Sequence, residues 1–146
     1  MKAKKSIKYL FYTGLIFFVI LLRAHIAELN LLYFDKKFSF NLFYLVIELL
    51  ISIGLGFIFG LKHIIIEARK EGKWQFNFVK LIIIGTPLLF MSLYRIWIYG
   101  NIQFLRDILI YSLGQFPIFI LSTSSVALFQ LSFGYTVITS FYKDTR

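Results

Sequence analysis

Hydrophobic residues form four long stretches, and short segments between them carry most of the charge. The second stretch, from about residue 40 to 61, and the third, from about 81 to 99, are each long enough to cross a hydrocarbon core of about 30 Å as an α-helix. The first stretch is short for a crossing, so we expect its helix to continue past Arg23 and to occupy about residues 8–28. This pattern predicts membrane-spanning helices.

The last apolar stretch, from about residue 108 to 142, is too long for one crossing and barely long enough for two. Charge favours one crossing. Four spans place eleven of the sixteen Lys and Arg residues on the cytoplasmic side, whereas five spans give nine and seven. We therefore expect an interfacial or re-entrant segment over about 101–115, and a last helix over about 117–141 with Pro117 near its start.

The pattern as a whole predicts an all-α integral membrane protein, a single-domain four-transmembrane-helix bundle with up-down topology. Both termini are then cytoplasmic. Residues 30–39 form a short connection with a turn at Asp35 to Lys37, and residues 62–80 form a cytoplasmic loop that begins as a helical extension and turns near Gly72. Pro87 falls inside the third span, where its missing amide predicts a kink or a local compensation.

Composition supports membrane insertion, with 59% hydrophobic residues and only 16% charged residues in 146. The basic start resembles that of a signal peptide, but no small-x-small cleavage site follows, which favours an uncleaved anchor. The formal charge of +9 is placed to orient helices in a cell inner or plasma membrane and to attract anionic lipid headgroups. Nothing resembles a nucleic-acid-binding module. The abundance of Ile, Phe, Lys and Tyr is typical of an AT-rich bacterial genome.

Glu48 is the sharpest candidate for function, because an ionised carboxylate is costly inside a span. It belongs to a stripe at four-residue spacing on one helix face. That stripe consists of Tyr44, Glu48, Ser52, Gly56 and Gly60. One interpretation is structural: Glu48 fixes helix register while the small residues let another backbone approach. The other is that Glu48 handles an ion, a proton or a ligand.

Arg95 lies toward the outer end of the third span, where two interpretations stay open. Its long side chain can reach the outer interface, or it can pair with Glu48, which lies at a similar depth. On the last helix, Thr123, Gln130 and Gly134 share a face and could complete a polar seam with Glu48 and Arg95. Such seams commonly hold helices together through hydrogen bonds.

Metal, cofactor and enzyme signals are weak. His63 and Glu67 have helical i, i+4 spacing, but the other ligands that a metal site needs do not accompany them. The sequence has no cysteine, no Gly-rich phosphate loop and no hydrolase motif. We expect no metal, no cofactor and no catalytic activity.

Two functional hypotheses remain. The first is a small accessory or scaffold subunit of an envelope or transport complex, packing against other membrane subunits or against itself. The second is a small ion, proton or solute transport element that uses the polar seam around Glu48. No inverted repeat is evident between the halves, which weakens the second hypothesis.

Overall fold

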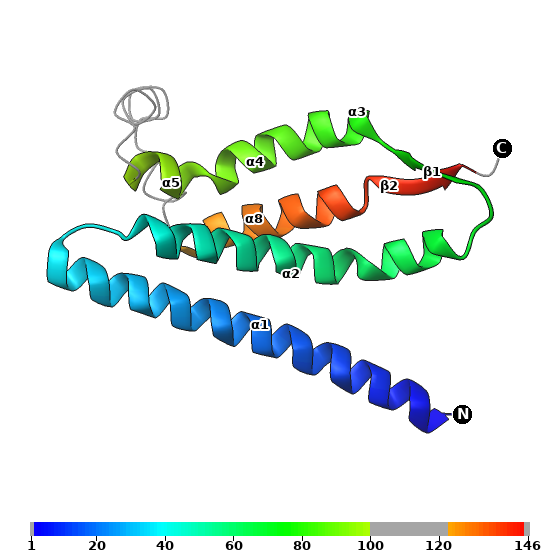
Figure 1. Cartoon of the computed structure of the whole chain (residues 1–146), viewed down its shortest axis with the longest axis horizontal. Helices are drawn as coiled ribbons and strands as arrows, with labels where there is room; N and C mark the ends of the chain where they lie inside the picture. Colours follow the sequence, from blue (N-terminus) through cyan, green and yellow to red (C-terminus); the bar gives the residue numbers. More distant parts are fainter. Residues whose placement is uncertain (1, 100–122, 145–146) are drawn as a thin grey trace.

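Three helical segments are long and apolar enough to cross a membrane, and they organise the structure (Figure 1). The computed structural model describes residues 2–99 and 123–144. The candidate spans are Leu10–Lys37, Leu42–Ala68 and Phe78–Tyr99. The chain is therefore a mostly helical protein of membrane type, as the hydrophobic pattern predicts. The predicted segment over 101–115 lies outside the described residues.

The first helix, α1, runs from Lys2 to Lys37 and is longer than predicted. The expected connection over 30–39 is wrong, because this stretch contains neither Gly nor Pro and Lys36 and Lys37 suit the negative end of a helix dipole. The helix ends at Phe38, which takes a positive φ of 52° and donates its amide to the Phe34 carbonyl at 2.7 Å. The turn thus falls just after the charged residues.

The second helix, α2, runs from Leu42 to Ala68 and includes the predicted extension beyond residue 61. Asn41 caps its start, since its side-chain oxygen accepts a hydrogen bond from the Phe43 amide at 3.0 Å. The Asn41 amide in turn donates to Oδ1 of Asn30 on α1, also at 3.0 Å. This pair of asparagines fixes the angle between α1 and α2.

The third helical segment is made of four pieces that follow one another: α3 (Phe78–Lys80), η1 (Leu81–Gly85), α4 (Thr86–Ser92) and α5 (Tyr94–Tyr99). The η1 piece is a turn of π-helix, and Pro87 follows it in the first turn of α4. A wide turn at this point accommodates the proline, which has no amide hydrogen to give to the preceding turn. The compensation expected at Pro87 is local.

The last helix, predicted over 117–141, is α8, which is described from Thr123 to Ile138. Residues 117–122 lie outside the described residues. The predicted C-terminal end is wrong, because Phe141 belongs to a β-strand. The Thr139 and Ser140 hydroxyls bond back to the Tyr135 and Thr136 carbonyls and finish the helix there.

A two-stranded antiparallel sheet corrects the all-α prediction. Strand β1 (Lys73–Phe76) pairs with β2 (Phe141–Asp144), with Phe76 opposite Phe141. Gly72 leads into β1 with a φ of 131°, a conformation that disfavours other residues. The sheet lies at the same end of the molecule as the two chain termini, which we call the sheet end (Figure 1).

Helix α2 lies at the centre of the molecule and packs most extensively against α8, with α1 on another side. The crossing of α2 and α8 is very close. A Cβ added at Gly56 would lie 2.6 Å from the Tyr135 amide nitrogen, and one at Gly134 would overlap the Ile53 carbonyl oxygen. Gly60 meets Ile138 in the same way. Gly56 and Gly134 therefore lie where two backbones touch, and Gly60 leaves room for the Ile138 side chain.

Candidate functional site

Glu48 and Arg95 form a buried ion pair between α2 and α5. Arg95 Nη1 donates to Glu48 Oε2 at 2.8 Å, and the two residues are only 7% and 2% exposed. Of the two interpretations of Arg95, the structure thus agrees with pairing to Glu48 and not with a side chain that reaches the outer interface. A buried pair of this kind needs further hydrogen bonds to offset the loss of hydration.

Arg23 brings α1 to the same site. Its Nε donates to Ser52 Oγ at 2.8 Å, and the Ser52 hydroxyl donates to the Glu48 backbone carbonyl, also at 2.8 Å. Arg23 interacts electrostatically with both Glu48 and Arg95, attractively with the first and repulsively with the second. We call Arg23, Glu48, Ser52 and Arg95 the charged cluster. It links α1, α2 and α5.

Gln130 connects α8 to the third helical segment. Its Nε2 donates to the Ser92 carbonyl at 3.1 Å, at the point where α4 gives way to α5. The Ser92 hydroxyl donates to the Leu89 carbonyl within the same segment at 2.9 Å. Thr123 is the first residue of α8, and its side-chain surroundings lie outside the described part of the chain. Gln130 thus makes an interhelical hydrogen bond to the backbone of the third helical segment.

An aromatic group covers the end of the charged cluster farther from the sheet. The Arg95 guanidinium lies over the Phe40 ring at 5.4 Å from its centroid. Phe40 in turn stacks with Phe34 of α1 at 4.7 Å and meets Tyr99 at 4.3 Å. Cation–π contact in a desolvated place adds to the retention of Arg95.

Four buried polar atoms have no hydrogen-bond partner within the part of the chain that the structure describes. They are Nδ2 of Asn30, Oε1 of Glu48, the hydroxyl of Tyr94 and Oε1 of Gln130. Buried polar atoms without partners are costly to the folded state. The Glu48 oxygen can accept a hydrogen bond or bind a cation, and the Tyr94 hydroxyl can also donate.

His63 and Glu67 each contact β2, at different residues, and do not share one ligand position. His63 Nε2 lies 3.0 Å from the Phe141 carbonyl oxygen, and Glu67 Oε2 accepts from the Lys143 amide at 3.0 Å. Lys70 pairs with the other Glu67 oxygen. Among the described residues, no three His, Asp or Glu side chains are grouped as metal ligands would be. The two side chains attach the second strand to the end of α2.

Three members of the polar interior were not singled out from the sequence: Arg23, Asn30 and Tyr94. A signal for the first two existed, because both are polar residues at i, i+7 spacing on one apolar helix and so share a face. Tyr94 gave no such signal, since tyrosine is common in membrane spans. It is nevertheless fully buried.

Compared with family models, with curated proteins and with solved structures, the chain has no match.

Proposed function

We propose that this protein is a non-catalytic accessory or scaffold subunit of a larger envelope or transport complex, which it joins through helix packing in the membrane. The observation that carries the proposal is the use of the intramembrane charges. Arg95 donates a hydrogen bond to Glu48, and Arg23 donates one to Ser52. Both hydrogen bonds join one helix to another. A site that binds and releases a solute needs polar groups that change partners easily.

The close crossing of α2 and α8 supports the same proposal. Backbones that touch at Gly56 and Gly134 leave no room for a solute to pass between these two helices. Small residues at such crossings are the usual means by which membrane helices pack tightly. The described core is therefore built for rigidity.

Helix α1 offers the surface on which a partner would pack. Only 6% of its apolar candidate span is buried within the molecule, compared with 28% for α2. Phe17, Phe18 and Leu21 are each more than 60% exposed. In a complex, a helix of another membrane subunit, or of a second copy, would replace lipid along this face.

The topology that we propose has four spans, with the sheet end in the cytoplasm of a bacterium and the inner or plasma membrane around the helices. The position of both termini at the sheet end supports it (Figure 1). The four lysines near the N-terminus, together with Lys62 and Arg69, would then follow the positive-inside rule and lie near anionic lipid headgroups. Since the chain lacks cysteine, single cysteines at Lys2 and Arg146 should both resist an impermeant thiol reagent in intact cells. Labelling at Arg146 alone would show an odd number of spans.

Photo-crosslinking in cells tests the subunit proposal. A photoreactive phenylalanine replaces Leu21 on α1, and the matched control replaces Ile83 on the third helical segment, which is equally exposed at 67% against 66%. We expect one defined adduct with a membrane protein from position 21 and none from position 83. Equal adducts at both positions, or none at either, would contradict the proposal.

A second candidate, a small ion, proton or solute transport element, is favoured by one observation: the unpartnered Glu48 Oε1, Gln130 Oε1 and Tyr94 hydroxyl. Glu48→Gln separates the two proposals. Thermal stability is measured in detergent, and proton or ion flux is measured in liposomes. A loss of stability with no flux in the unaltered protein favours the subunit, whereas a flux that disappears in a stable variant favours transport.

A further inference from the structure

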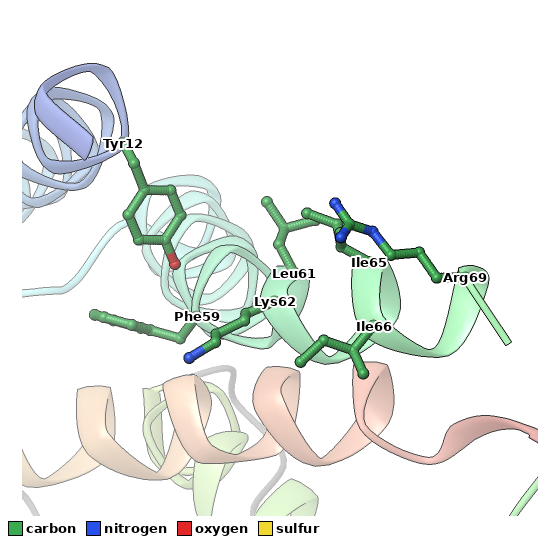
Figure 2. Close-up of a pocket in the computed structure, with 7 residues that line it drawn as sticks. All are labelled: Tyr12, Phe59, Leu61, Lys62, Ile65, Ile66 and Arg69. Carbon is green, nitrogen blue, oxygen red and sulfur yellow. The ribbon is translucent and has the colours of Figure 1, made fainter. Parts of the chain in front are cut away.

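A cavity of about 600 Å³ opens between α1 and the end of α2, away from the charged cluster (Figure 2). Tyr12 closes one side, since its hydroxyl crosses to α2 and donates to the Ile58 carbonyl at 2.7 Å. The other lining residues come from α2 and from its C-cap, Arg69. They are Phe59, Leu61, Lys62, Ile65, Ile66 and Arg69.

The cavity has an apolar wall and a cationic rim. Phe59, Leu61, Ile65 and Ile66 are between 38% and 52% exposed, so a large part of each side chain is available for contact. Lys62 and Arg69 are exposed, and neither side chain has a hydrogen-bond or ion-pair partner in the described part of the chain. Such a combination suits an amphiphile with a negatively charged head.

Depth in the membrane identifies the amphiphile. Lys62 lies about 30 Å along α2 from Leu42 at 1.5 Å per residue, which equals the thickness of the hydrocarbon core. With Leu42 at one boundary of the hydrocarbon core, Lys62 lies at the other, next to the lipid phosphates. Arg69 is two turns farther on, about 10 Å, but helical side chains point back toward the start of their helix. Figure 2 shows Arg69 extending back along α2 toward Ile65.

We propose that this cavity binds one anionic glycerophospholipid of the leaflet at the sheet end. Lys62 and Arg69 attract the phosphate group, and an acyl chain runs along Tyr12 and Phe59 toward the bilayer centre. This is a defined site rather than the general attraction of basic residues to a charged membrane. It does not depend on the accessory role, because it needs only the placement of α1 and α2 in a bilayer.

Native mass spectrometry of the full chain in detergent tests the site. The protein is titrated with phosphatidylglycerol or with phosphatidylcholine, and bound lipids are counted. The unaltered protein should prefer phosphatidylglycerol. K62Q/R69Q should weaken that binding about thirtyfold, since each cation near a membrane surface contributes roughly fivefold to the attraction of an anionic lipid. Both side chains are exposed, so circular dichroism should show an unchanged helical fold.

The matched control is K36Q/K37Q, which removes two exposed lysines from the other end of α1. It should bind phosphatidylglycerol as the unaltered protein does. An equal loss in this control would mean diffuse electrostatics and would overturn the site. Equal binding of the two lipids, or unchanged binding by K62Q/R69Q, would overturn it too. Displacement of the lipid by sn-glycerol 3-phosphate would show that the ligand is a soluble phosphoester instead.

Discussion

Removal of one partner of the Glu48–Arg95 pair is the most informative perturbation of this fold. Glu48→Leu leaves Arg95, which is only 7% exposed, as a buried cation without its carboxylate. Arg95→Met leaves Glu48, 2% exposed, as a buried anion. Breaking a buried pair in this way costs about 3–5 kcal/mol of the free energy of unfolding. Each single variant should therefore be strongly destabilised.

Replacement of both residues should behave differently. The double variant E48L/R95M removes both charges and keeps apolar side chains of similar length, a change that is commonly neutral or stabilising. Arg23 loses an attractive neighbour and a repulsive one together, so the two changes at Arg23 oppose each other. We expect the double variant to lie within about 1 kcal/mol of the unaltered protein, far from the sum of the two single losses.

Equilibrium unfolding in mixed micelles, followed by circular dichroism as the SDS fraction rises, measures these free energies. Asp35→Asn is the control, because it neutralises an exposed carboxylate at the end of α1 and should change stability by less than about 0.5 kcal/mol. Single losses that add in the double variant to within about 0.5 kcal/mol would refute the coupling between Glu48 and Arg95. The pair would then be two independent charges.

Three further changes test the packing and the turns, each by the same unfolding assay. Gly134→Ala should lower the free energy of unfolding by about 1–3 kcal/mol, because its methyl group would overlap the Ile53 carbonyl. Gly54→Ala has open space around the new methyl group and should be neutral or stabilising. Equal effects at the two glycines would contradict the close crossing of α2 and α8. Asn41→Ala removes the cap of α2 and should cost about 1 kcal/mol, and no change would mean that the cap contributes nothing. Gly72→Ala should cost about 1–3 kcal/mol through backbone strain at its positive φ, and a stabilised variant would refute that strain.

The sequence predicts features that depend on local chemistry. Apolar length predicts the three candidate spans, and four-residue spacing places Glu48, Ser52 and Gly56 on one inward face. The pairing of Glu48 with Arg95 was one of two open interpretations, because depth alone does not tell whether an arginine turns inward or toward the interface.

Features that depend on long-range pairing were missed. Strand β1 alternates polar and apolar residues over only four positions, Lys73 to Phe76, and β2 does not alternate. Their pairing, with Phe76 against Phe141, joins segments far apart in the sequence. The length of α1 was underestimated for a different reason. The charges near its end suggested a turn, but they are compatible with a helix whose end leaves the apolar region.

The side-by-side packing of α2 and α8 has a consequence for biosynthesis. Helix α2 enters the membrane long before the ribosome completes α8, so the groove around Gly56 has no α8 to fill it during that interval. Lys80 likewise lacks its hydrogen-bond acceptors during that interval, because it donates to the Thr139 carbonyl at 3.1 Å and to the Thr139 hydroxyl at 2.8 Å in the folded protein. Only a full-length chain can close the groove and the sheet together. A prematurely terminated product would therefore leave the Gly56 face of α2 without its partner helix.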